Sequence, residues 1–224
     1  MNTEGLESYL DLLEQYASWE EELVERNEAQ EKVSTQNQYL IEQLLQSKNP
    51  IKLELGAGKE RKLPGWTTVD ICEDCDLRLN LAEPLPFPDS CVSVIYSSHV
   101  LEHFSYPYPL DNLLSECYRI LEDGGTFSVC VPNARIYIEA YLNPEKFAYE
   151  KYCRYKPGFH FNSKIDYINY IAYMAGHHRY MFDEENLPVI LTKTGFKNAR
   201  IRDFDSTIDL ESRKYESIYA IGEK

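Results

Sequence analysis

A short apolar run that ends in Gly-x-Gly is the first feature of this sequence whose residue types suit ligand chemistry. The run covers residues 51–55, and the glycines are Gly56 and Gly58. Because glycine lacks a Cβ, the backbone of such a loop can approach a ligand closely. The next apolar run ends in Asp70, whose carboxylate could accept hydrogen bonds from both hydroxyls of a ribose, each worth about 1.5–3 kcal/mol. With Glu54 as a second acid, these residues predict a nucleotide-binding crossover.

Gly-x-Gly alone is a weak signal, since an ordinary strand-to-loop turn uses the same residues. The sequence argues against one class of nucleotide, the nicotinamide dinucleotides. Nicotinamide dinucleotide sites carry a third glycine in Gly-x-Gly-x-x-Gly, and Arg61 occupies that position here. An oxidoreductase is therefore the weakest of the alternatives.

The histidines are the residues best suited to proton transfer near neutral pH. His99 follows the apolar run 92–96 directly, and His103 lies one helical turn later on the same face. Three more lie in or at the end of an aromatic-rich segment: His160, His177 and His178. We predict His103, His99 and His178 as candidates for the catalytic base. The structural alternatives are a histidine that positions the loop at His99 and a helix-packing histidine at His103.

A metal site is not expected from the sequence. Cys72 and Cys75 have the spacing of a zinc knuckle, but a structural zinc needs about four ligands and no second cysteine pair follows. A solvated turn is the expected structure there. No arrangement of carboxylates and histidines along the chain predicts a metal ion either.

Alternating strand and helix patterns supply the elements that must position these residues. The apolar run 92–96 suits a central parallel strand covered on both faces, and it ends at Ser97, Ser98 and His99, which therefore lie at the carboxyl edge of a sheet, where ligands bind in open α/β folds. Only eleven residues separate Gly58 from Asp70, so the usual crossover helix is shortened or absent. Further strands are expected at 76–80, 126–131, 199–204 and 216–221, and a helix at 110–121.

Several short motifs occur in one order along the first half of the chain. They are Glu54–Gly58, Leu63–Trp66, Val69–Ile71, Asn80-Leu81, Leu85–Asp89 and Ser97–Phe104. This order resembles the class I S-adenosylmethionine-dependent methyltransferases and, within them, the type 11 methyltransferase domains often found beside glycan-biosynthesis enzymes. The resemblance covers about residues 50–204. It implies an α/β, Rossmann-like methyltransferase sheet of seven strands in the order 3-2-1-4-5-7-6, with strand 7 antiparallel.

The resemblance also implies a cofactor and the residues that hold it. The cofactor is S-adenosyl-L-methionine, with S-adenosyl-L-homocysteine as product, and Asn80-Leu81 would lie near its adenine. The residues expected to frame it are Glu54, Gly56, Ala57, Gly58, Asp70, Ile71, Asn80, Leu81, Ser97, Ser98 and His99. The expected reaction is O-methylation of a sugar or small-molecule hydroxyl in glycan or secondary metabolism. Two alternatives remain open: a protein or amine N-methyltransferase, and a non-catalytic cofactor-binding module that works through its N-terminal helices.

The chain divides into an extension and a catalytic domain. Residues 1–48 are acidic, contain no proline and carry apolar residues at loose helical spacing, which predicts one or two amphipathic helices. They serve as a brace, a homodimerisation arm or a docking helix for a partner. Asn49-Pro50 marks the boundary. Residues 49–224 form the methyltransferase domain, in which 133–182 is an aromatic-rich insertion expected to cap the substrate.

Composition restricts the partners. A formal net charge of −14 argues against general affinity for nucleic acid, whose binding depends on Lys and Arg. No apolar run approaches the roughly 20 residues of a membrane helix, and residues 1–5 do not resemble a signal peptide. Of the six cysteines, Cys91 and Cys130 lie in or beside strand-like runs, where reduced thiols are expected. A cytoplasmic protein that acts on a small-molecule acceptor is the expectation.

Overall fold

A computed structural model of the chain describes residues 3–59, 63–158 and 163–224. The chain divides into two compact units, Met1–Gln43 and Leu44–Lys224. The first consists of most of helix α1 (Thr3–Gln46), a single 44-residue helix where one or two were predicted. Within the described part of the chain, no helix is long and apolar enough to span a membrane.

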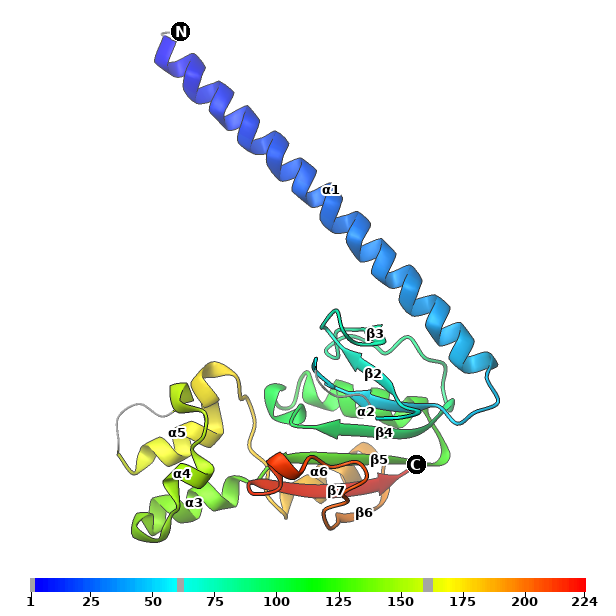
Figure 1. Cartoon of the computed structure of the whole chain (residues 1–224), viewed down its shortest axis with the longest axis vertical. Helices are drawn as coiled ribbons and strands as arrows, with labels where there is room; N and C mark the ends of the chain where they lie inside the picture. Colours follow the sequence, from blue (N-terminus) through cyan, green and yellow to red (C-terminus); the bar gives the residue numbers. More distant parts are fainter. Residues whose placement is uncertain (1–2, 60–62, 159–162) are drawn as a thin grey trace. The chain divides into compact units, whose positions relative to one another are not determined.

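The second unit is built on one seven-stranded sheet in the order β3-β2-β1-β4-β5-β7-β6 (Figure 1). Its strands are β1 (Lys52–Leu55), β2 (Thr67–Asp70), β3 (Leu77–Arg78), β4 (Val92–Ser98), β5 (Leu121–Pro132), β6 (Lys197–Ile201) and β7 (Ser217–Glu223). The pairs among β1 to β5 are parallel, whereas β7 runs antiparallel to both β5 and β6. The predicted Rossmann-like methyltransferase fold is therefore confirmed.

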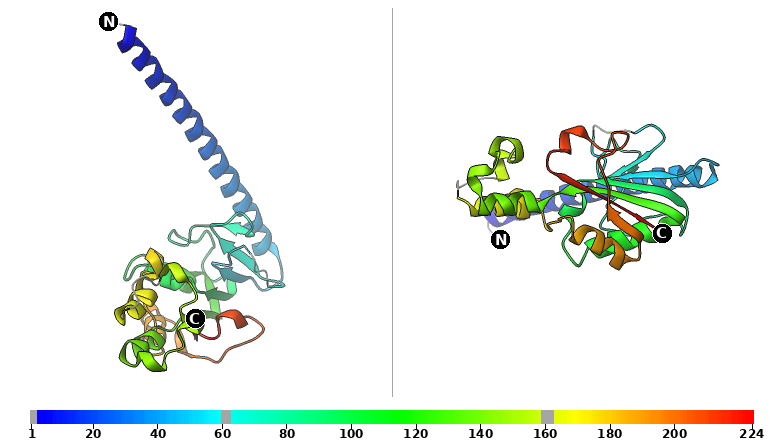
Figure 2. Two further views of the ribbon diagram at one scale, coloured as in Figure 1. Left: turned by 60° about the vertical axis from the view of Figure 1, so that its left-hand side comes forward. Right: turned by 90° about the horizontal axis from the view of Figure 1, so that it is seen from below.

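Helices cover the sheet and connect its strands. The longer ones are α2 (Leu110–Ile120), α3 (Ala134–Leu142), α5 (Ile165–Tyr173) and α6 (Asn186–Thr194), and α4 (Tyr149–Tyr152) is a single turn. One face of the sheet is covered by α2 and α6 (Figure 2). The 3-10 turns are η1 (Leu101–His103), η2 (Pro144–Lys146), η3 (Lys156–Gly158), η4 (Met174–Gly176) and η5 (Glu211–Arg213). The helical stretch predicted from residue 100 is thus one 3-10 turn.

The central strands are buried on both faces, but only one face is fully apolar. Leu53, Ile95 and Phe127 are paired neighbours on that face and have no exposed surface. The opposite face carries the more polar residues Glu54, Tyr96 and Ser128, which are at most 3% exposed. The third strand is shorter than the predicted 76–80. Asp76 instead uses its carboxylate to accept hydrogen bonds from the backbone and side chain of Thr68, which ends the regular ladder there.

A buried ion pair joins the strands at the other side of the sheet. The Asp209 carboxylate, which has 7% of its surface exposed, accepts hydrogen bonds from both terminal nitrogens of Arg202 at 2.6 and 2.8 Å. The hydroxyl of Tyr96 in β4 donates to the same carboxylate at 2.9 Å. This network fixes the segment between β6 and β7 against the centre of the sheet.

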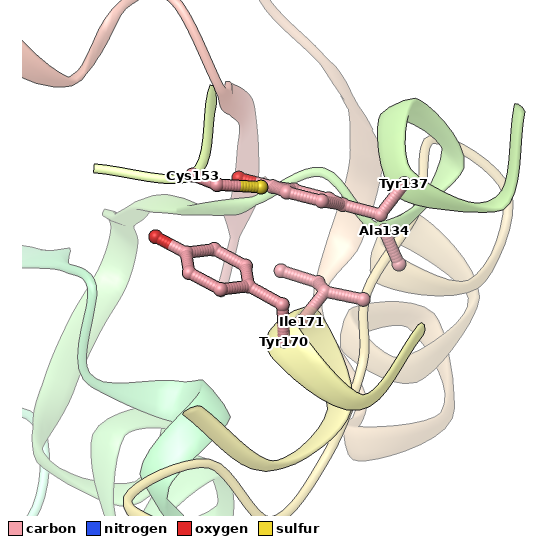
Figure 3. Close-up of a cluster of buried hydrophobic side chains, with 5 residues drawn as sticks. All are labelled: Ala134, Tyr137, Cys153, Tyr170 and Ile171. Carbon is pink, nitrogen blue, oxygen red and sulfur yellow. The ribbon is translucent and has the colours of Figure 1, made fainter. Parts of the chain in front are cut away.

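The aromatic segment 133–182 folds into a small helical layer with its own core. Tyr137 and Tyr170 stack with ring centres 5.4 Å apart, and Ala134, Cys153 and Ile171 complete the cluster (Figure 3). Most of the aromatic rings around it, such as Phe147, pack against this cluster. The aromatic side chains of this segment therefore contribute mainly to its own hydrophobic core.

Candidate active site

The carboxyl ends of β1, β2 and β4 bring the predicted ligand-binding loops together. β1 lies between β2 and β4, with Leu55 paired to Val69 on one side and to Ser97 on the other. The loop after β1, the acid that ends β2 and the histidine that follows β4 are consequently neighbours. This is the edge at which open α/β sheets bind ligands.

Left-handed backbone conformation explains the two glycines of the loop. Gly56 and Gly58 both have φ of +66°, which side chains rarely allow. A Cβ at Gly56 would clash with Cγ2 of Val100, so the loop packs directly on the turn that carries His99 and His103. A Cβ at Gly58 would meet no atom of the described residues within 4 Å. The space beside Gly56 is therefore filled by Val100, whereas the space beside Gly58 is open to a ligand.

Asp70 holds the glycine loop with its carboxylate. Its Oδ2 accepts a hydrogen bond from the Gly58 backbone N–H at 3.0 Å, and its Oδ1 accepts one from the Ile71 N–H at 2.6 Å. Each carboxylate oxygen can accept a second hydrogen bond. The half-buried acid thus keeps the capacity to bind a diol while it braces the loop.

A cavity of about 320 Å³ opens between the ends of β2 and β4. Its lining combines several of the predicted cofactor residues with two of the predicted catalytic histidines: Gly56, Asp70, Ile71, Leu79, Asn80, Leu81, His99, Val100, His103 and Phe104. Ile71 keeps 66% of its surface exposed, an unusual state for an isoleucine beside a cavity. The Asn80 side-chain oxygen accepts from the Ala82 N–H at 3.0 Å and so shapes its own turn.

A second cavity, of about 350 Å³, lies on the other side of Gly56. Its lining holds Glu54, Gly56, Ala57, Gly58, Lys59, Ser98, Leu210 and Arg213. Arg213 was not foreseen from the sequence. Its Nη1 donates to both the backbone oxygen and the hydroxyl of Ser98, at 2.6 and 2.9 Å. No motif surrounds Arg213, and only the return of the chain along β7 brings it beside β4.

Ser97 differs from its predicted neighbours. It has no exposed surface and lines neither of these two cavities. Its hydroxyl is buried and has no hydrogen-bond partner among the residues that the structure describes. Its predicted contact with the cofactor is thus unsupported by the shape of the site.

All three predicted catalytic histidines lie close together. The rings of His103 and His178 are 5.3 Å apart in an edge-to-face arrangement. The Nδ1 of His103 bonds to the backbone oxygen of His177 at 2.9 Å, and the Nδ1 of His178 to that of Ile171 at 2.8 Å. A carbonyl oxygen only accepts, so both Nδ1 atoms carry the proton and both Nε2 atoms carry a lone pair.

In His99 the lone pair is on the other ring nitrogen, Nδ1. The hydroxyl of Ser217 donates to the backbone oxygen of Arg213 at 2.7 Å and therefore accepts from Nε2–H of His99, also at 2.7 Å. The lone pair of His99 is then on Nδ1, which lies 3.8 Å from Oε1 of Glu102. His99 has φ of +55°, a strained backbone conformation of a kind that is common at functional sites.

Glu102 is the residue of this cluster that the sequence did not single out. It has 2% of its surface exposed, and neither carboxylate oxygen has a hydrogen-bond partner in the described part of the chain. Burial raises the pKa of Glu102 to about 8. Burial also lowers the pKa of His178 to about 4 and that of His99 well below its usual value. Both imidazoles are consequently neutral at neutral pH.

The end of the aromatic segment brings His178 to this cluster. The backbone N–H groups of Arg179 and Tyr180 donate to the backbone oxygen of Glu102 at 2.7 and 3.2 Å. His177 is exposed, with its ring against Tyr155. His160 lies outside the described residues.

The two cysteines of the predicted solvated turn lie under the glycine loop. Their sulfur atoms are 2.7 Å apart, and both thiols contact the backbone oxygen of Gly58, Cys72 at 3.4 Å and Cys75 at 3.2 Å. The segment is the predicted turn, with Glu73 and Asp74 exposed, whereas the two cysteine side chains are half-buried. Burial and the neighbouring Cys72 raise the pKa of Cys75 to about 12, so it is held as a thiol.

Part of the chain matches a known protein family. Residues 51–129 match the family described as a methyltransferase domain. A probable S-adenosylmethionine-dependent methyltransferase of Mycolicibacterium smegmatis is 44% identical over 54 residues, which are 24% of this chain and 20% of that protein. The aligned part of this chain therefore spans about a fifth of the length of that curated relative.

Solved structures show weaker similarity. A SAM-dependent methyltransferase from Archaeoglobus fulgidus is 18% identical, with a TM-score of 0.48 over 84% of this chain and 94% of that one. A possible histamine N-methyltransferase from Thermotoga maritima is 18% identical, with a TM-score of 0.47 over 91% of this chain and 97% of that one. Residues 51–129 therefore match a methyltransferase-domain family, and the sheet that contains them has the strand order expected of the Rossmann-like methyltransferase fold.

Proposed function

We propose that the chain binds S-adenosylmethionine across the two cavities that meet at Gly56 and transfers its methyl group to a hydroxyl of a small or sugar-like acceptor. The observation that carries this proposal is the composition of the 320 Å³ cavity. It places Asp70, suited to a ribose, in the same space as His99 and His103, suited to proton transfer.

The charges of the two cavities fit the parts of this cofactor. Asp70 would accept from the ribose hydroxyls, and the exposed Ile71, with Leu81, offers an apolar surface for a flat base. In the other cavity, Glu54 would accept from the ammonium group of the methionine part, and the Arg213 guanidinium would face its carboxylate. The open face of Gly58 leaves room for the ligand between them.

When bound, the cofactor supplies a methyl group already activated by its sulfonium. The chain then has two tasks, to align the acceptor and to receive its proton. Alignment lowers the barrier by roughly 7–11 kcal/mol, and a placed base accelerates the reaction about 10²–10⁴-fold. His99 is the residue we assign to the proton, because its lone pair on Nδ1 is fixed by the bond from Nε2–H to Ser217 and the residue lines the cavity.

The aromatic segment contributes to acceptor recognition through its last turn. Its tyrosines mainly fill the core around Tyr137 and Tyr170, so they do not form an open sugar platform. Tyr180 stacks on Tyr106 with ring centres 5.2 Å apart, next to the backbone bonds that fix His178. If the segment 133–182 covers the acceptor, the residues that do so are therefore 177–180, at its end.

An acceptor screen tests the proposal. The full chain is incubated with S-adenosylmethionine and with sugars, sugar phosphates, phenols or amines, and release of S-adenosylhomocysteine is followed. A fall in turnover with hydroxyl compounds of about 10²–10⁴-fold in His99→Asn, larger than any accompanying loss of cofactor affinity, is the expected result. Turnover with amines alone supports the N-methyltransferase alternative. His177→Ala, an exposed neighbour of His178, is the matched control and should keep full activity.

A further inference from the structure

We propose that Glu102, His103 and His178 form a binding site for a divalent transition-metal ion beside the cofactor cavity. One carboxylate oxygen and one nitrogen from each imidazole all lie within 4.8 Å of one another. Ligands at about 2.0–2.2 Å from one zinc ion are roughly 3–3.5 Å apart, so ligand atoms that lie up to 4.8 Å apart need to approach one another by up to roughly 1.3–1.8 Å. Side-chain rotation alone can supply a movement of that size.

Both imidazoles are already oriented as metal ligands are. A metal-bound histidine typically donates its other ring N–H to a carboxylate, a water or a backbone oxygen, which fixes the tautomer and the ring. Nδ1–H of His103 does so to the oxygen of His177, and Nδ1–H of His178 to the oxygen of Ile171. The Nε2 lone pairs of both rings are therefore left for a ligand.

The Glu102 carboxylate provides the independent observation. It is buried, and neither of its oxygens has a hydrogen-bond partner among the described residues. A buried carboxyl group without a hydrogen-bond partner is destabilising in either protonation state, so an unsatisfied group of this kind calls for an explanation. His99 gives no hydrogen bond to it, because the nitrogen that faces Glu102 is the one without a proton and lies 3.8 Å away. A cation between these lone pairs would satisfy the carboxylate.

The donor set indicates the class of ion. Two imidazoles and one carboxylate suit zinc, iron, manganese or cobalt in the divalent state, whereas magnesium and calcium prefer oxygen ligands alone. Glu102 and His178 close the buried side of the site, while His103 is exposed and lines the cavity. Coordination positions on that side remain available for water or substrate oxygens.

The use of such an ion rests on the proposed function. An ion held there would bind acceptors with two neighbouring oxygen atoms, as in sugar diols or catechols, and would lower the pKa of the bound hydroxyl. His99, beside Glu102, would then receive the proton. The inference thus specifies the substrate class as vicinal hydroxyl compounds.

Metal titration of the chelator-treated full chain tests the site without an acceptor. Calorimetry with ZnCl2 and visible absorption with CoCl2 should show one site that saturates at micromolar concentration, with MgCl2 at least 100-fold weaker. Glu102→Gln, which keeps the shape of the side chain, and His178→Gln should each weaken zinc binding at least 30-fold. His177→Ala should bind as the unaltered chain does.

The cysteine pair needs its own control, since Cys72 and Cys75 with Asp70 form another group of possible ligands. The double variant Cys72→Ser/Cys75→Ser should keep the site, and the cobalt spectrum should lack thiolate charge-transfer bands. S-adenosylhomocysteine affinity, measured in parallel, reports folding and the proposed function separately. The inference is overturned if no ion binds, or if binding survives in Glu102→Gln and His178→Gln but disappears in the cysteine variant.

Discussion

The Asp70 carboxylate accepts a hydrogen bond from the backbone N–H of Gly58 at 3.0 Å, so the acid that ends β2 holds the glycine loop that follows β1. Sequence motifs assign such an acid to the ribose alone. The structure adds a positioning task, because the same carboxylate holds the backbone of the loop at which we propose the cofactor binds. A substitution of Asp70 is therefore expected to change the conformation of the glycine loop as well as the affinity for the cofactor.

Replacement of Asp70 by Asn tests this double task. The amide keeps one acceptor oxygen but loses the charge, and a hydrogen bond to a charged group is worth about 1.5–3 kcal/mol. We expect the affinity for S-adenosylhomocysteine to fall about 10- to 100-fold in calorimetric titration. Glu73→Gln, an acid with 82% of its side chain exposed, is the control and should bind normally. An unchanged affinity in Asp70→Asn would remove this residue from the site.

Alanine at the two glycines should have different effects. Gly56→Ala places a Cβ against Val100 and forces a positive φ, so we expect the free energy of unfolding to fall by about 2–4 kcal/mol. Gly58→Ala carries only the strain of its positive φ, about 1–2 kcal/mol, because no atom of the residues that the structure describes lies in the way of its Cβ. Urea denaturation measures both. Equal losses at the two positions would show that the packing of Gly56 on Val100 has been misjudged.

Arg213 should matter for cofactor binding although no motif contains it. Arg213→Met retains the aliphatic part of the side chain but removes both the bonds to Ser98 and the positive charge of the cavity. The affinity for S-adenosylmethionine should decrease at least 10-fold, which corresponds to about 1.4 kcal/mol. Lys214→Met is the matched control, since Lys214 lies outside both cavities. If the two variants bind equally well, the assignment of Arg213 to the cofactor carboxylate is wrong.

Asp209 is expected to affect stability but not ligand binding. Asp209→Asn leaves the half-buried guanidinium of Arg202 without its charged partner, and the loss of one member of a buried pair typically costs about 3–5 kcal/mol. Urea or thermal denaturation should show this loss, whereas Asp203→Asn, at an exposed position, should stay within 0.5 kcal/mol, roughly the usual surface effect. A stable Asp209→Asn variant would mean that the network around Tyr96 contributes little.

The strand order was implied by the family resemblance, whereas the positions of single residues at strand ends could be predicted from local patterns. Gly56 directly follows the apolar run 51–55, and Asp70 ends the next strand, so the parallel pairing of these strands places the two residues side by side. The short connection from Gly58 to Asp70 predicted a crossover helix that is shortened or absent, and the described residues of that connection contain no helix.

The acceptor side of the site depends on contacts between distant segments. Arg213 reaches Ser98 from 115 residues further along the chain, and His178 reaches Glu102 through backbone bonds at Arg179 and Tyr180. Neither contact leaves a pattern in the sequence. Glu102 was not singled out for another reason, since glutamate is almost never fully buried and nothing in the local sequence signals its burial here.

Binding of the cofactor is the central claim, and calorimetric titration of the purified full chain tests it most directly. S-adenosylmethionine and S-adenosylhomocysteine should each bind one site per chain with micromolar affinity, and a nicotinamide dinucleotide should not bind. If neither sulfur compound binds to a folded protein, the methyltransferase account of this chain is contradicted.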